Sequence, residues 1–202
     1  HKLQHFDIIQ PWSDSLDLGP LGQVLQHCRS FGWQCQHGTP IHPHANKSND
    51  NKYQYSHPGY AWAVSRKFLE RVWGGGGSSG PLIDWAILGS GDYHMAWAAL
   101  SRVALTVPKQ YQPSYLRKCL DWQKRAYAVS GGEVGFIHGS IEHQFHGPKK
   151  RRFYNERYKL LVRNKFDPDT QIIHDEQGLA TLVGNRRLEH AIHKYNVSRT
   201  ED

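Results

Sequence analysis

Residues 138–154 bring histidines and cations together in one short run of the sequence. The run contains three histidines, a Gly-Pro pair and four consecutive cations: His138, His143, His146, Gly147, Pro148, Lys149, Lys150, Arg151 and Arg152. Imidazole nitrogens bind divalent metal ions, whereas ammonium and guanidinium groups bind phosphate. Few structural roles require both kinds of side chain side by side, so this run is the first candidate for a functional site.

His143 and His146 are the candidate metal ligands of this run. In an extended strand the two side chains point to opposite faces, so they converge only if the strand breaks near Phe145. Gly147 and Pro148 favour such a break. Two histidines alone do not make a metal site, so we expect a third ligand, a carboxylate, from elsewhere in the chain. The alternative is that both histidines bond to backbone carbonyls.

Asp92 is the candidate general base. It lies in a glycine-loosened turn, between Gly91 and His94, where apolar residues at helical spacing begin. A helix N-terminus favours an ionised carboxylate, and glycines let a ligand approach the backbone closely. A carboxylate in this position beside a histidine could accept a proton from a substrate. The alternative is that Asp92 only caps the helix.

Two further groups of side chains could bind a substrate. Tyr60 and Trp62 alternate with small residues and could stack on a sugar or a base, or could simply be core aromatics. Residues 149–152 lie at the start of an expected helix, where the helix dipole disfavours cations. We therefore expect Lys149 to Arg152 to bind an anion, although a solvated run of charge is the alternative.

The composition limits the class of protein. The chain has 202 residues, enough for a domain with a core, and a formal net charge of +7, which suits anionic partners. Its three cysteines are odd in number, which favours reduced thiols. It contains no signal peptide and no apolar run of roughly 20 residues, so we expect a cytoplasmic protein without a membrane span.

The elements that position these residues follow from local patterns. We expect strands at 6–10, 60–64 and 134–145, helices after Ser65, after Asp92, over 115–127 and from 152 to 167, and a weak amphipathic helix within 179–202. Residues 24–31 fit a short helix or a strand, and 36–58 read as a loop whose histidines, 37, 42, 44 and 57, are solvated. The Gly/Ser run at 74–80 predicts a flexible linker.

Three segments carry a resemblance to a known family: His57 to Ala63 (His-Pro-Gly-Tyr-Ala-Trp-Ala), Asp84 to Ala96 (Asp-Trp-Ala-Ile-Leu-Gly-Ser-Gly-Asp-Tyr-His-Met-Ala), and Gly139 to Gly147 with the basic helix that follows. In this order they resemble GT-A-fold nucleotide-sugar glycosyltransferases, especially phage-like and bacterial ones. The resemblance covers roughly residues 5–200. It implies an α/β fold, the C-terminal part of a GT-A-like mixed sheet flanked by helices. Residues 1–202 would then form a single domain, the acceptor-side half of a catalytic domain.

The resemblance also implies an activity and roles for particular residues. A sugar would pass from a nucleotide-sugar donor to a glycan or other hydroxyl acceptor, assisted by manganese or magnesium. Asp92 resembles the catalytic base and His94 its neighbour in the acceptor pocket, which the turn at Gly91 faces. Tyr60 and Trp62 resemble the wall of the sugar site. His143 or His146 resembles the metal ligand, and Lys149, Lys150, Arg151 and Arg152 would neighbour the donor diphosphate.

The chain departs from the family in one respect. Relatives carry an Asp-x-Asp metal motif upstream, and no such motif precedes Phe6; Asp14 and Asp17 have the wrong spacing, and Asp167 and Asp169 follow a helix near the end. Either the donor-binding half lies outside this chain, or the activity is lost. A basic nucleic-acid-binding or virion-associated protein without catalysis is the main alternative, and a metal-dependent nuclease is a third.

Overall fold

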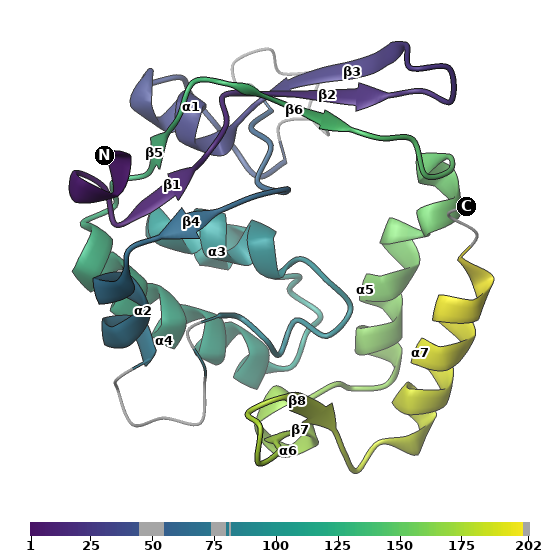
Figure 1. Cartoon of the computed structure of the whole chain (residues 1–202). Coiled ribbons are helices and arrows are strands. Elements are labelled where there is room, and N and C mark those ends of the chain that lie inside the picture. Colours follow the sequence, from purple (N-terminus) through teal and green to yellow (C-terminus); the bar gives the residue numbers. More distant parts are fainter. Residues whose placement is uncertain (45–54, 74–79, 81, 200–202) are drawn as a thin grey trace.

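The computed structural model describes residues 1–44, 55–73, 80 and 82–199. It is a mixed α/β structure in which small mixed sheets are flanked by helices (Figure 1). The predicted linker at 74–80 lies outside the described residues except for Gly80. Among the residues that the structure describes, no helix is both long and apolar enough to cross a membrane. The three cysteines are free, as predicted.

The first sheet has three strands, and its central strand, β1 (Ile8–Gln10), is buried. Its order is β4 (Ala63–Val64), β1 and β5 (Gly135–Phe136), with β1 antiparallel to β4 and parallel to β5. All three residues of β1 are buried, which explains its continuous apolar start. Helix α1 (Phe31–Gln36) lies against β5 so closely that a Cβ on Gly32 would be 2.3 Å from the carbonyl oxygen of Gly135.

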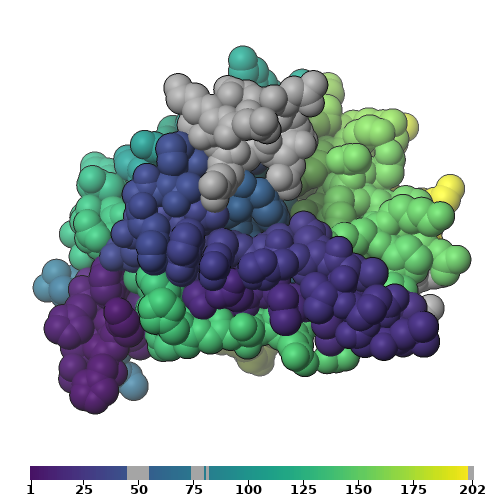
Figure 2. Space-filling view, turned by 90° about the horizontal axis from the view of Figure 1, so that it is seen from above, coloured from purple at the N-terminus to yellow at the C-terminus, as the bar shows by residue number. Residues whose placement is uncertain are grey.

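The second sheet positions the histidines of the first candidate run. Its order is β3 (Val24–Arg29), β2 (Asp14–Leu18) and β6 (Ser140–His143), with β2 antiparallel to β3 and parallel to β6. Figure 2 looks down on this side of the molecule and shows the purple N-terminal strands lying alongside the green segment from the second half of the chain. The β2–β6 register places Asp17 opposite His143.

Three helices pack below these sheets and build the core. They are α2 (Arg66–Trp73), α3 (Gly91–Ala99) and α4 (Pro113–Ser130). Ser65 caps α2 as predicted, since its Oγ accepts a hydrogen bond of 3.0 Å from the backbone N–H of Phe68. The largest buried side chains are aromatic: Trp12, Trp85, Trp97, Trp122, Tyr115, Phe31 and Phe166. The short 3-10 helices η1 (Lys2–Gln4) and η3 (Val103–Leu105) complete this part.

The C-terminal part adds two helices and a hairpin. The 3-10 turn η4 (Lys149–Arg152) leads into α5 (Tyr154–Arg163), followed by α6 (Pro168–Gln171), the antiparallel strands β7 (Ile172–His174) and β8 (Ala180–Leu182), and α7 (Arg186–Ser198). Helices α5 and α7 lie side by side (Figure 1). The hydroxyl of Tyr195 in α7 donates a 3.0 Å hydrogen bond to the carbonyl oxygen of Arg152.

Several predicted elements have other bounds in the structure. Residues 24–29 are a strand rather than a helix, and a short helix, α1, follows them. The strand expected at 60–64 is reduced to two residues, because Tyr60 has a φ of 66°. The strand expected at 134–145 is divided, since β5 pairs with β1 whereas β6 pairs with β2. Residues 180–182 form a strand, so the last helix begins only at Arg186.

Candidate functional site

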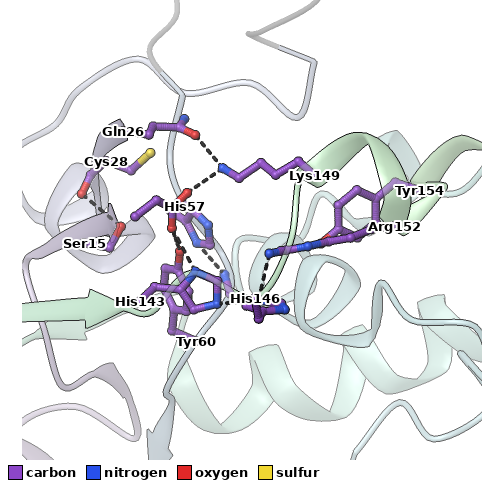
Figure 3. A network of polar contacts seen from close by, with 12 residues as sticks. Ser15, Gln26, Cys28, His57, Tyr60, His143, His146, Lys149, Arg152 and Tyr154 are labelled. Carbon is purple, nitrogen blue, oxygen red and sulfur yellow. Dashed lines mark hydrogen bonds and ion pairs between the residues drawn. The ribbon is translucent and has the colours of Figure 1, made fainter. Parts of the chain in front are cut away.

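A cluster of polar side chains lies where β2 and β6 end. We call it the Asp17 cluster; its members are Asp17, Tyr60, His143, His146, Lys149 and Arg152. Figure 3 shows Lys149 and Arg152 extending from η4 toward the rings of His57, Tyr60, His143 and His146. The strand break near Phe145 that the sequence predicts is present, because β6 ends at His143. The chain then turns back through Gly147, whose φ is 89°.

Asp17 is the negative centre of this cluster. Its carboxylate accepts hydrogen bonds from the hydroxyl of Tyr60, from Lys149 Nζ at 2.5 Å and from His143 Nδ1 at 3.1 Å. Burial alone would raise the pKa of Asp17, but the hydrogen bonds from Lys149 and Tyr60 and the nearby positive charge lower it to about 2. A carboxylate thus reaches His143 from a strand 126 residues away, but as the hydrogen-bond partner of its Nδ1 and not as the expected third metal ligand.

A nitrogen atom of His146 lies within hydrogen-bond distance of nitrogen atoms of both His143 and Arg152. His146 Nε2 lies 3.1 Å from His143 Nε2 and 2.8 Å from a terminal nitrogen of Arg152. A neutral ring cannot use one nitrogen both to accept from Arg152 and to donate to His143. Arg152 is 8% exposed, and its buried Nε has no hydrogen-bond partner among the residues that the structure describes. Because Arg152 can only donate, the lone pair of His146 Nε2 is used in accepting its hydrogen bond, so an ion bound at this nitrogen would have to displace Arg152.

A metal ion would find two nitrogen ligands here. Two imidazole nitrogens bound to one ion at about 2.1 Å and at a right angle lie about 3 Å apart, which is close to the 3.1 Å between the histidines. Asp17 accepts from the far nitrogen of His143, which is how carboxylates usually orient a metal-binding histidine. Within residues 1–44, 55–73, 80 and 82–199, no group of three or more His, Cys, Asp or Glu side chains could hold a metal ion.

Asp92 lines a separate cavity of about 830 Å³. It lies in the first turn of α3, and the backbone N–H of Tyr93 donates to its Oδ1 at 2.8 Å. Burial raises the pKa of Asp92, an effect opposed by that hydrogen bond and by the charge of Arg157. The cavity wall is rich in aromatic and polar side chains: His44, Tyr55, His57, Ser90, Tyr93, Lys109, Tyr154, Asn155, Arg157 and Tyr158.

His57 and Tyr60 connect the cavity with the Asp17 cluster. The ring of His57 lines the cavity and stacks on Tyr60, with 4.4 Å between ring centroids. Its Nδ1 accepts a hydrogen bond of 3.0 Å from the backbone N–H of Gly59. A Cβ on Gly59 would lie 2.8 Å from the His57 ring and 3.3 Å from Asp92 Oδ2, so both groups adjoin the same glycine. The two candidate sites therefore share one wall.

The other predicted site residues are dispersed. Trp62 donates to the carbonyl oxygen of Pro58 at 2.8 Å and packs beside Phe31. Gly91 packs against the carbonyl oxygen of Ile83, where a Cβ would be 3.2 Å away. Lys150 and Arg151 are exposed, whereas Lys149 and Arg152 belong to the Asp17 cluster. The structure thus brings Tyr60, His143, His146, Lys149 and Arg152 together and places Asp92 in the adjoining cavity.

His94 lies in the core and does not line the cavity. It is 1% exposed, and its Nδ1 donates to Thr106 Oγ1 at 2.7 Å, while that hydroxyl donates to the carbonyl oxygen of Val103. Burial, together with the positive charge of Arg157, lowers the pKa of His94 to about 4. In this position His94 anchors α3 to the turn at 103–106.

His94 is expected to make stability depend on pH. Between pH 6.5 and pH 4 the unfolded chain binds a proton at this ring that the folded chain does not, so the free energy of unfolding falls as pH falls. The difference amounts to at most about 3 kcal/mol. Urea unfolding at pH 7 and pH 4.5 measures it. His94→Gln should flatten the pH dependence relative to His190→Gln, an exposed control; an unchanged slope would contradict the assignment.

Sequence reasoning missed three residues of these sites: Asp17, His57 and Arg157. The spacing of Asp17 from Asp14 does not fit an Asp-x-Asp motif, so the sequence gives no metal-motif signal for it. The loop-like surroundings of His57 predict a solvated ring, but in the structure burial lowers the pKa of His57 to about 4. Its position directly before Pro-Gly, at the mouth of an aromatic segment, was the available signal.

In comparisons with known proteins, the chain matched no protein-family model, no curated protein and no solved structure.

Proposed function

We propose that this chain is the acceptor-side part of a GT-A-type glycosyltransferase, which moves a sugar from a nucleotide-sugar donor to a hydroxyl group of a glycan or other acceptor. One observation carries the proposal: the carboxylate of Asp92 lines a cavity with aromatic and polar walls, directly beside a cationic cluster. Aromatic rings with a few polar groups are the usual walls of sites for small ligands.

Asp92 would act as the general base. As the acceptor oxygen attacks the anomeric carbon, its proton would pass to the Asp92 carboxylate, and the bond between that carbon and the donor phosphate would break. Because burial raises the pKa of Asp92, its carboxylate is a stronger base, when deprotonated, than that of an exposed aspartate. The order of the three sequence segments that resemble GT-A transferases supports the same role.

The Asp17 cluster would hold the leaving diphosphate. Lys149, which is paired with Asp17, and Arg152 would supply positive charge to the phosphate oxygens. His143 and His146 would contribute two ligands to a manganese or magnesium ion, the others coming from substrate oxygens or another chain. Such an ion would neutralise charge on the diphosphate. Asp17 would hold His143 in the tautomer whose Nε2 carries the lone pair.

Calorimetric titration of UDP-sugars and GDP-sugars, with and without manganese, tests the donor side. We expect binding that manganese strengthens at least about tenfold and that His143→Ala and His146→Ala make independent of manganese. His138→Ala, outside the cluster, is the matched control. Absence of binding in both conditions would mean that this chain does not form a donor site by itself.

One observation favours a second candidate, a nucleic-acid-binding protein. Residues 149–165 contain eight Lys or Arg against one Glu, an excess equal to the +7 of the whole chain. Phe145, Phe153 and Tyr154, beside these cations, are about 40% exposed and could stack on bases. This function predicts that binding of single-stranded DNA weakens steeply with salt and needs no metal.

A further inference from the structure

Arg157 places a positive charge in the cavity that holds Asp92. It lies on α5, whereas Asp92 lies in the first turn of α3, so the two side chains enter the cavity from different elements. The guanidinium carbon lies 4.8 Å from the centre of the Tyr154 ring and 5.5 Å from that of Tyr158. Ring contacts of this kind fix the plane of a guanidinium without using its N–H groups.

The hydrogen-bonding capacity of Arg157 is mostly unused. A guanidinium has five N–H donors, and among the residues that the structure describes Arg157 donates one hydrogen bond, to Ser90 Oγ at 3.3 Å. Its Nε is buried and has no hydrogen-bond partner in this described part of the chain. No carboxylate oxygen in the described part of the chain lies within 4 Å of it, and Asp92 influences it only through charge at longer range. Buried N–H donors normally have a hydrogen-bond partner, so a donor without one suggests that a ligand supplies the acceptor.

The surrounding backbone is shaped to accommodate this side chain. Gly89 has a φ of 93°, and a Cβ there would lie 2.5 Å from Nη1 of Arg157. Ser90, the acceptor of the single hydrogen bond, has a φ of 75°, which is unfavourable for a residue with a side chain. Its Oγ also lies 3.0 Å from the hydroxyl of Tyr158. A strained turn, a glycine and two tyrosines thus hold one guanidinium in place.

We infer that the cavity binds a ligand with a phosphate or carboxylate group, and that Arg157 holds this group while Asp92 faces a hydroxyl of the same ligand. The inference rests on the proposed function, and it specifies the acceptor as an anionic sugar. Planar, bidentate recognition of an oxyanion is the main use of a preorganised guanidinium. Lys109, which also lines the cavity, adds positive charge.

The donor diphosphate is a less suitable partner for Arg157. Two other cations, Lys149 and Arg152, already lie together in the Asp17 cluster, and Arg152 donates to the hydroxyl of Tyr154 at 3.2 Å. Arg157 lies over the ring of this same tyrosine. In the cavity a diphosphate would face the Asp92 carboxylate, whereas in the Asp17 cluster both Lys149 and Arg152 lie beside the single carboxylate of Asp17. A single anionic group on an acceptor balances the charge of Arg157 with less repulsion.

Binding of matched sugars tests the inference without any donor. The probes are glucose and galactose, their 6-phosphates and their uronic acids, titrated against the wild-type protein and three variants. We expect the phosphates or the uronates to bind at least about tenfold more tightly than the neutral sugars. Arg157→Gln should abolish this preference, and Arg157→Lys should keep part of it. Arg163→Gln, an exposed change of equal charge on the same helix, should keep all of it.

Each outcome of the titration is decisive. Preference for the phosphates identifies a phosphate-bearing acceptor, and preference for the uronates identifies a carboxylate. Equal binding of charged and neutral sugars, or no binding of either, overturns the inference, as does an Arg157→Gln variant that behaves like Arg163→Gln. Failure of the proposed transferase is measured separately, as absence of sugar transfer by a protein that still prefers anionic sugars.

Discussion

Asp92→Asn is expected to lower sugar transfer at least about a hundredfold while the fold is retained. Removal of a general base typically costs a factor of this size. The asparagine oxygen can still accept the 2.8 Å hydrogen bond from the backbone N–H of Tyr93, so the first turn of α3 keeps its geometry. Loss of the charge at the helix N-terminus should cost less than about 1 kcal/mol of stability.

The measurement is turnover of a nucleotide-sugar with its acceptor, followed across pH. Because burial raises the pKa of Asp92, activity should decline with falling pH already above the ordinary aspartate value of 3.8. Asp121→Asn, an exposed change of the same kind on α4, serves as the control. Near-normal turnover in Asp92→Asn, with an unchanged pH profile, would exclude Asp92 as the base.

The sequence predicted those helices and strand ends that depend on residues close together in the chain. The capping serine at 65, the apolar spacing within 115–127 and the break at Gly147 and Pro148 each depend on neighbours a few residues away. The structure contains the helix after Ser65, α4 and the end of β6 accordingly. The general α/β class follows from the same alternation of short strands and helices.

The assembly of the sites depends on pairings that no local pattern encodes. The parallel alignment of β2 with β6 brings Asp17 to His143 across 126 residues. Because the chain changes its partner strand between Phe136 and Ser140, one predicted strand became two, each in a different sheet. In the sequence Arg157 is one of many cations on a basic helix, and only the structure shows that it lines the cavity and that its Nε has no partner among the described residues.

The arrangement of the two sites fits a reaction between two bound ligands. His57 and Tyr154 line the cavity, while Tyr60, stacked on His57, bonds to Asp17, and Arg152 bonds to Tyr154. One layer of aromatic side chains therefore separates the carboxylate of Asp92 from the cations of the Asp17 cluster. In the proposed reaction a carboxylate takes up the proton of the acceptor, and cations at an adjacent position stabilise the departing diphosphate.

Asp17→Asn is expected to weaken nucleotide-sugar binding about 10- to 100-fold. The change removes the charge that faces Lys149 and the acceptor that orients His143, and loss of such orienting carboxylates has effects of this size. It should also lower the free energy of unfolding by about 1–3 kcal/mol, because Asp17 is 7% exposed and accepts from three groups. Titration calorimetry and urea unfolding measure the two effects.

The pH dependence separates a role of Asp17 in the cluster from a general loss of stability. The pKa of Asp17 is lowered to about 2 in the folded protein. Asp17 therefore contributes fully to the free energy of unfolding above pH 3.8, and this contribution is lost as the pH falls from 3.8 to 2. Asp17→Asn should remove this fall in stability. Asp14→Asn on the same strand, which breaks contacts with the more exposed His27 and Arg29, should leave nucleotide-sugar binding unchanged. Equal effects of both substitutions on binding would mean that β2 supports the site only as a strand, with no part for the Asp17 carboxylate.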